Sequence, residues 1–272
     1  MERWRQWWRW RRWGQRLSDS RALVAAPRIV VTGGALRVGR AIALRLASRG
    51  VSLVLTYRTS AAACASTAQD ARDAGSASVS MHRLDLTDAH SIDAFAQEAL
   101  RLGAIDGIVH NASSFQRTPF GEILERDAVE QYKSDALGAL LLSQALAASL
   151  RDARVRASMP QGAGIVVLGD AHAEAVPRCG YTSYLMAKAA AHALVRQLAV
   201  EFAPEVRVNG IAPGVILWPE SMPDAARAEY LQRVPLKRSG TPEEAAALAE
   251  FLLLDAHYST GQIVLLDGGR SL

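Results

Sequence analysis

Residues 28–40 read Arg-Ile-Val-Val-Thr-Gly-Gly-Ala-Leu-Arg-Val-Gly-Arg, and this stretch decides the fold. Its β-branched run predicts a strand over 28–31, and the amphipathic pattern that follows predicts a helix over 41–48. A glycine-rich turn between a strand and the amino terminus of a helix lets backbone N–H groups approach a phosphate closely. The stretch therefore predicts a dinucleotide-binding site.

Strand and helix patterns alternate along the rest of the chain, which is typical of a parallel sheet. Further strands are predicted over 51–56, 77–83, 105–110, 165–169, 206–211 and 262–266. Further helices are predicted over 61–74, 88–102, 122–150, 183–203 and 242–254, with an irregular segment and a short helix over 213–235. We expect a Rossmann-type, doubly wound α/β fold with seven parallel strands, helices on both faces and a cleft at the carboxyl ends of the strands.

The composition suits one large domain, which we place over residues 28–272, because half of the 272 residues are hydrophobic. No apolar run is long enough to predict a transmembrane segment. Cys64 and Cys179 fit neither a disulfide framework nor a metal site, so we expect a reducing, cytoplasmic location and no metal.

Residues 1–27 differ from everything that follows, because arginines alternate there with five tryptophans. This stretch carries more positive charge than the net charge of +4 of the whole chain, so the remaining residues are net negative. Charge combined with aromatic rings also suits an anionic membrane surface or a nucleic acid. We interpret the stretch as a disordered extension and expect no nucleic-acid partner.

Tyr184 and Lys188 lie four residues apart in a predicted helix, which places the phenol and the ammonium on one face. The cation is expected to favour the phenolate and to make Tyr184 a proton donor or acceptor near neutral pH. Asp170 follows the apolar run 165–169, fourteen residues before Tyr184. These three residues are the candidate catalytic groups.

Over residues 28–272 the chain resembles the short-chain dehydrogenase/reductase family. The motifs of that family occur in order, as the glycine-rich turn, Asn111-Ala112, Tyr184-x-x-x-Lys188 and Pro213-Gly214. Two departures, Arg37 in place of a glycine and Asp170 in place of a catalytic serine, are similar to the pteridine reductase branch and the bacterial dihydromonapterin reductases near it. That branch also shares Asn111–Phe115, Gly180–Tyr184, Met222-Pro223 and Asp267–Arg270. The resemblance further implies a homotetramer.

The resemblance also assigns the site residues. The cofactor-binding positions are Gly33, Arg37, Val38, Gly39, Tyr57, Arg58, Thr59, Asp85, Leu86, Asn111, Ala112, Ser113, Lys188, Pro213 and Gly214. The substrate-binding positions are Arg37, Ser113, Phe115, Asp170, Tyr181, Tyr184 and Trp218. Lys188 is expected to hold the nicotinamide ribose as well as to tune Tyr184.

The end of the second predicted strand indicates which cofactor binds. A carboxylate there would bind the ribose hydroxyls of NAD, but the chain has Tyr57-Arg58-Thr59, so Arg58 can pair with the 2′-phosphate of NADPH. Asp85 either contacts adenine or caps the turn that follows it.

Other positions leave alternatives open. Phe115 either stacks on the substrate ring or is an ordinary core aromatic, and Trp218 walls the pocket or is exposed in a lid. Asp135 falls where the family commonly has an asparagine, and could hold a water or pair with Lys188. His110 is expected to be a strand-end residue without chemistry.

Reducing a pterin C=N bond requires hydride at carbon and a proton at a ring nitrogen. An enclosed Asp170 with a raised pKa could supply or relay that proton, whereas its alternative role is to cap the loop after the fifth strand. We therefore predict an NADPH-dependent reductase of dihydropterins. The alternatives are a carbonyl reductase, such as a 3-oxoacyl-carrier-protein reductase, and a non-catalytic dinucleotide sensor.

Overall fold

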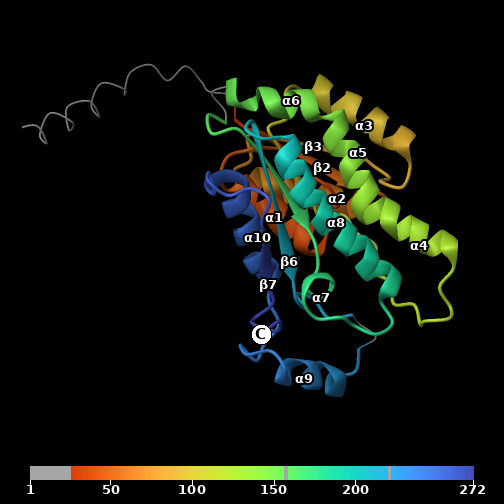
Figure 1. The fold of residues 1–272 in the computed structure, drawn as a ribbon. Coiled ribbons are helices and arrows are strands. Elements are labelled where there is room, and N and C mark those ends of the chain that lie inside the picture. Colours follow the sequence, from red (N-terminus) through yellow and green to blue (C-terminus); the bar gives the residue numbers. More distant parts are fainter. Residues whose placement is uncertain (1–25, 156–158, 220–221) are drawn as a thin grey trace, which may run out of the picture.

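A computed structural model describes residues 26–155, 159–219 and 222–272 of the chain. Seven parallel strands form one sheet in the order β3-β2-β1-β4-β5-β6-β7 (Figure 1). They are β1 Arg28–Val31, β2 Ser52–Tyr57, β3 Ser78–Arg83, β4 Gly107–His110, β5 Ala163–Leu168, β6 Val206–Pro213 and β7 Ile263–Leu266. The order reverses beside β1, which has β2 on one side and β4 on the other. The predicted doubly wound fold is confirmed.

Helices cover both faces of the sheet. One face carries α1 Arg37–Ala47, α2 Ala61–Asp73 and α10 Pro242–Glu250. The other carries α3 Ala89–Arg101, α5 Gly138–Ala145, α6 Ala147–Arg151 and α8 Thr182–Glu201. Central strands are buried on both sides: Val30 packs into one core, whereas its neighbours Ile29 and Val31 pack into the other.

Two helices differ from the sequence prediction. α1 begins at Arg37, four residues before the predicted start, so the second half of the glycine motif is already helical. The predicted helix over 122–150 is divided into α4 Glu125–Tyr132, a π-helical turn Lys133–Leu137, α5 and α6. Gly138, the first residue of α5, lies against the loop that follows β3, since a Cβ atom there would be 2.5 Å from the Leu86 carbonyl oxygen.

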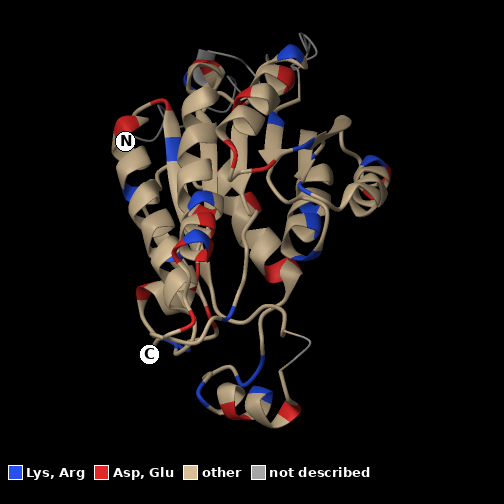
Figure 2. Ribbon diagram, turned by 90° about the vertical axis from the view of Figure 1, so that its right-hand side faces the viewer, with Lys and Arg blue, Asp and Glu red and all other residues tan. Residues whose placement is uncertain are grey.

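Two short helices lie near the carboxyl ends of the strands. α7, Ala171–Glu174, follows β5 directly and had no sequence signal of its own. α9, Asp224–Gln232, is the short helix predicted within 213–235 and lies apart from the two helix layers, with both acidic and basic residues (Figure 2). α7 borders the cleft described below through His172, and α9 borders a neighbouring cavity through Ala226.

The described residues include no helix long and apolar enough to cross a membrane. The predicted amino-terminal extension over 1–27 lies, as far as residue 25, outside the described residues.

Candidate active site

The carboxyl ends of the strands open onto a cleft of about 630 Å³. Every residue predicted to bind cofactor or substrate lines this cleft, except Tyr181, which lines a neighbouring cavity. The residues come from segments that follow β1 through β6, because the ends of parallel strands meet at one edge of the sheet. The topology thus gathers positions that the sequence spreads over almost two hundred residues.

The glycine-rich turn is held closed by Asn111. Its side-chain amide donates hydrogen bonds to the carbonyl oxygens of Thr32 (3.0 Å) and Gly33 (3.1 Å). Gly39 packs into the same point, where a Cβ atom would collide with the Gly33 carbonyl oxygen and lie 2.5 Å from Asn111 Nδ2. Asn111 was predicted to bind the cofactor. Its amide nitrogen also holds the glycine-rich turn in place through these two hydrogen bonds.

The amino terminus of α1 lines the cleft, and no side chain of the described residues caps it. Its N-cap residue, Leu36, makes no side-chain cap, and the first turn contains no acidic residue. The first N–H groups of α1 and the helix dipole are therefore available to an anion.

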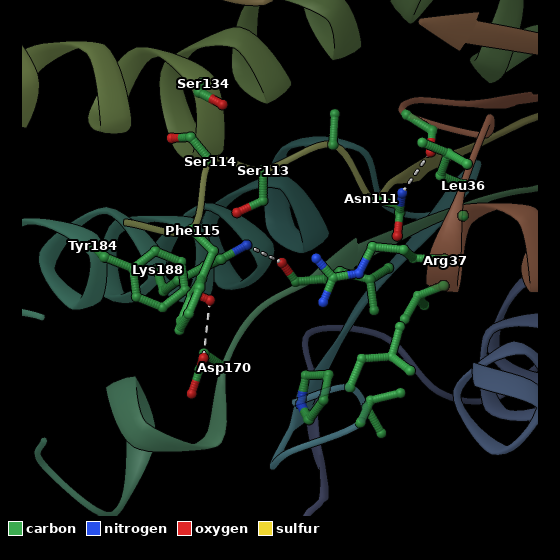
Figure 3. Close-up of a pocket in the computed structure, with 18 of the residues that line it drawn as sticks. Leu36, Arg37, Asn111, Ser113, Ser114, Phe115, Ser134, Asp170, Tyr184 and Lys188 are labelled. Atoms are coloured by element: carbon green, nitrogen blue, oxygen red, sulfur yellow. Dashed lines mark hydrogen bonds between the residues drawn. The ribbon is translucent and has the colours of Figure 1, made fainter. Parts of the chain in front are cut away.

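Arg37 occupies a backbone conformation that normally belongs to glycine, with a φ of 54°. Its exposed side chain extends from the start of α1 into the cleft (Figure 3). A left-handed backbone costs a non-glycine residue about 1–2 kcal/mol. The chain keeps the glycine-like turn and places a cationic side chain on it.

Arg58 lies at the far end of the cleft, at the end of β2. It forms a 3.6 Å ion pair with Glu130 of α4, but both side chains are at least half exposed, so the pair is weak. Asp85 accepts hydrogen bonds from the backbone N–H (3.0 Å) and hydroxyl (2.8 Å) of Thr87, so its turn-capping role is present. Burial acts to raise the pKa of Asp85, but the Thr87 hydrogen bonds and nearby arginines bring it below the usual value.

Asp170 joins the candidate catalytic groups into one hydrogen-bonded set. Tyr184 donates its hydroxyl hydrogen bond to Asp170 Oδ2 at 2.9 Å (Figure 3). Asp170 Oδ1 accepts from the backbone N–H of His172 at 2.7 Å and lies 2.9 Å from the His172 ring nitrogen Nδ1. Asp170 is also the N-cap of α7. The two roles that the sequence offered for this residue, proton chemistry and loop capping, therefore occur together.

The electrostatics of this set differ from the sequence expectation in two respects. Burial acts to raise the pKa of Asp170, but the hydrogen bonds and charge of His172 outweigh it and lower that pKa, so the resting group is a carboxylate. The pKa of Tyr184 is raised well above its usual value, first by burial and then by Asp170 and Asp135. Lys188 does not overcome these effects, so Tyr184 is a neutral phenol that carries a proton. The expectations of a raised Asp170 pKa and a readily ionised Tyr184 are both wrong.

Lys188 lies one turn from Tyr184 on α8 and is buried. Its Nζ donates to the Leu168 carbonyl oxygen at 2.9 Å and lies 4.0 Å from Asp135 Oδ2. Asp135 sits on the π-helical turn with a buried side chain, and its Oδ2 has no hydrogen-bond partner among the described residues. Burial raises the pKa of Asp135 despite the opposing effect of Lys188. The buried acid with a raised pKa is therefore Asp135 rather than Asp170.

Aromatic rings line the other end of the cleft. Phe115 stacks on Tyr181 with ring centres 5.1 Å apart and meets Tyr184 edge-on at 5.0 Å. It is 48% exposed, which excludes the core alternative. Trp218 is half-buried and meets Tyr230 of α9 edge-on at 5.4 Å, so it is a wall residue rather than an exposed lid residue.

Three residues at this end escaped the sequence analysis. His172 contacts Asp170 and lies 3.3 Å, through Nε2, from the Tyr230 hydroxyl. Arg178 lines the cleft and stacks over the Tyr181 ring at 4.6 Å. His172 is the second residue after Asp170, and an aspartate that caps a helix commonly accepts a hydrogen bond from that position. This spacing was a signal that could have identified His172. Nothing in the sequence linked Tyr230, sixty residues downstream of Asp170, to the cleft.

Comparisons with known proteins agree with this geometry. A family model described as enoyl-(acyl carrier protein) reductase matches residues 34–271. Pteridine reductase 1 of Leishmania tarentolae is 33% identical, with 91% of this chain and 97% of the relative covered. The chain belongs to the short-chain dehydrogenase/reductase family.

Other members of the family are similar over comparable lengths. The 7alpha-hydroxysteroid dehydrogenase of Escherichia coli (strain K12) is 30% identical, with 88% of this chain and 92% of that enzyme covered. A short-chain dehydrogenase/reductase from Serratia marcescens superposes with a TM-score of 0.81 at 27% identity, covering 92% of this chain and 99% of that structure. The family is an oxidoreductase family whose members bind a nicotinamide dinucleotide.

The cleft of this short-chain dehydrogenase/reductase fits such a cofactor. The uncapped start of α1 suits a pyrophosphate, and the close packing at Gly39 leaves that backbone bare. Among the described residues there is no group of three or more potential metal ligands.

Proposed function

We propose that the protein is an NADPH-dependent pteridine reductase, which reduces a dihydropterin to the tetrahydro form. The observation that carries the proposal is the hydrogen bond from Tyr184 to Asp170 in a cleft that also contains Arg37 and Phe115. The 33% identity to pteridine reductase 1 supports it. Dihydromonapterin, dihydrobiopterin and dihydrofolate are the candidate substrates.

NADPH is the proposed cofactor because the end of β2 presents Arg58 and no carboxylate. Its weak, solvent-exposed pairing with Glu130 leaves the guanidinium able to turn to a 2′-phosphate, which offers a stronger, charge-assisted partner. We expect Arg58→Asp to weaken binding of NADPH by at least tenfold and of NADH far less, as measured by equilibrium titration. Equal losses for the two cofactors would refute the assignment.

Bound NADPH would supply the hydride, and side chains of the cleft would deliver the proton. Phe115 offers a ring face for the flat pterin, and Arg37 a cation at the edge of the cleft. The Tyr184 hydroxyl already shares its proton with Asp170 Oδ2, which allows this pair to deliver a proton to a ring nitrogen. His172, at Asp170 Oδ1, can replace the proton that the pair gives up.

A carbonyl reductase is the second candidate. The Tyr184/Lys188 pair and the similarity to a hydroxysteroid dehydrogenase favour it, since a tyrosine proton can equally reach a carbonyl oxygen. A carbonyl reductase does not account for Asp170, because its carboxylate would lie near the negative charge that develops on the carbonyl oxygen of the substrate. The assembled Tyr184–Asp170 hydrogen bond argues against the sensor alternative, which needs no proton chemistry.

NADPH oxidation by the purified protein tests the proposal. Reduction of at least one of the three dihydropterins, with little activity on an acetoacetyl thioester, is the expected result. Asp170→Ser should lower pterin turnover at least tenfold. Preference for the acetoacetyl thioester, or a serine variant with unchanged pterin turnover, would reject the proposal.

The proposal includes a homotetramer in the reducing cytoplasm. Cys64 is buried with a pKa raised to about 11 by burial, and Cys179 is exposed; both are free thiols. Sedimentation velocity would test the oligomeric state, and a monomer at micromolar concentration would contradict it.

A further inference from the structure

A second cavity, of about 370 Å³, lies at the substrate end of the cleft. Arg178, Pro219 and Met222 line both hollows, so the second cavity continues the first. Its other walls include Arg117 and Tyr181. The second cavity adds space beyond the part of the cleft that contains Phe115, and two arginines line it.

Two loops that are distant in sequence build this cavity. The backbone N–H of Thr118 donates to the Gly180 carbonyl oxygen at 2.9 Å, which ties the loop after β4 to the loop before α8. Gly180 has a φ of 81°, and a Cβ atom there would lie 3.1 Å from Arg117 Nε. The glycine therefore provides both the turn and the space in which the Arg117 side chain crosses to the cavity.

Arg178 is fixed from the other side. Its guanidinium lies 4.6 Å from the centre of the Tyr181 ring, which in turn stacks on Phe115. A cation over an aromatic face keeps its N–H groups free at the edges. The stacked side chains therefore extend from Phe115, which is proposed to contact the substrate ring, to the Arg178 guanidinium at the second cavity.

Two arginines line the cavity, and among the described residues neither Arg117 nor Arg178 has a carboxylate as an ion-pair partner. By contrast, Arg227 on α9 is paired with Asp224 at 3.3 Å. Two guanidinium groups on one cavity repel each other unless an anion lies between them.

We infer that the second cavity binds an anionic group on the substrate's side chain, either a carboxylate or a phosphate. Guanidinium groups match the geometry of both anions. The tyrosine, proline and methionine walls suit the less polar link between that anion and the ring. The inference rests on the proposed pterin reduction and narrows its substrate class to pterins with a charged tail.

The test compares substrates that share the ring and differ in the tail. Dihydrofolate carries carboxylates, a side-chain-phosphorylated dihydropterin carries a phosphate, and dihydrobiopterin carries neither. In the double variant Arg117→Gln/Arg178→Gln, we expect KM for the charged substrates to rise about tenfold to hundredfold. KM for dihydrobiopterin should rise several-fold less than KM for the charged substrates, because this substrate carries no anionic group. Arg126→Gln, an exposed arginine on α4, is the matched control and should change nothing.

The two charged substrates identify the anion. A KM effect confined to dihydrofolate assigns a carboxylate site, one confined to the phosphorylated pterin assigns a phosphate site, and both results support the inference. Equal KM changes for charged and uncharged substrates, or none, would overturn it.

Equilibrium binding separates this inference from the proposed function. Calorimetry with oxidised folate and NADP⁺ should give a Kd that rises at least tenfold in the double variant, whereas the Kd of biopterin should not change. A protein that reduces no pterin but shows this Kd pattern would reject the reductase and keep the anion site. A protein that reduces pterins without the pattern would keep the reductase and reject the anion site.

Discussion

Arg37 combines a strained backbone with a side chain that the cleft uses, so replacing it should separate stability from activity. Its φ of 54° costs about 1–2 kcal/mol for a residue other than glycine. Its side chain is exposed and forms no hydrogen bond or ion pair with a described residue, so little is lost with it. Glycine increases the conformational entropy of the unfolded chain, which reduces the gain in unfolding free energy by about 0.4–1 kcal/mol. Arg37→Gly should therefore gain about 0.5–1 kcal/mol in unfolding free energy.

The measurements are a thermal unfolding scan and steady-state kinetics. A gain of that size corresponds to a rise in Tm of about 1–4 °C for a chain of this length. The same variant should lose about tenfold to hundredfold in kcat/KM, because a charged hydrogen-bond donor leaves the cleft.

Arg37→Ala is the control, since it removes the side chain and keeps the strained backbone. It should lose as much activity without the gain in Tm. Equal Tm values for the glycine and alanine variants would refute the claim that strain is stored at this position.

Three further predictions follow from buried contacts. His172→Gln removes the ring that lowers the pKa of Asp170, so unfolding free energy should fall by about 1.5–3 kcal/mol at neutral pH. Because a lowered carboxyl pKa stabilises the fold above the usual carboxyl pKa, urea titrations should show this deficit shrinking as pH falls through the Asp170 pKa; a pH-independent deficit would contradict the mechanism. Gly39→Ala should weaken NADPH binding more than tenfold, since the added methyl group collides with the Gly33 carbonyl, and unchanged affinity would be incompatible with the packing described. Arg207→Met should cost about 3–5 kcal/mol in denaturant unfolding, because the buried guanidinium donates to three carbonyl oxygens in and just after the π-helical turn Phe251–Asp255 that follows α10; a loss below about 1 kcal/mol would show that those carbonyls find other donors.

The sequence predicted the sheet well because its strands are buried on both faces and appear as short apolar runs. β1 was predicted to the residue, and β2 and β3 to within one residue at either end. Helix boundaries were less accurate where tertiary contacts decide them. The division of the predicted helix over 122–150 occurs where Gly138 packs against the Leu86 carbonyl, a contact that local sequence does not reveal.

The residues that form the site could also be predicted from the sequence, whereas the directions of their pKa shifts could not. Nearly all residues that the family motifs named line the cleft, and their spacing placed Tyr184 and Lys188 correctly on one face of a helix. The sign of the Asp170 pKa shift depends on His172, which folds back onto the carboxylate through α7. Such a contact requires coordinates, because burial alone would have raised the pKa.

The same carboxylate that starts α7 also accepts the hydrogen bond of the Tyr184 hydroxyl, and this overlap has an evolutionary consequence. Serine and aspartate are both favourable residues at a helix amino terminus. An ancestor could therefore exchange one for the other with little penalty to the local fold. New reaction chemistry would then be accessible by a single codon change, and laboratory evolution between ketone and imine reduction should begin at residue 170.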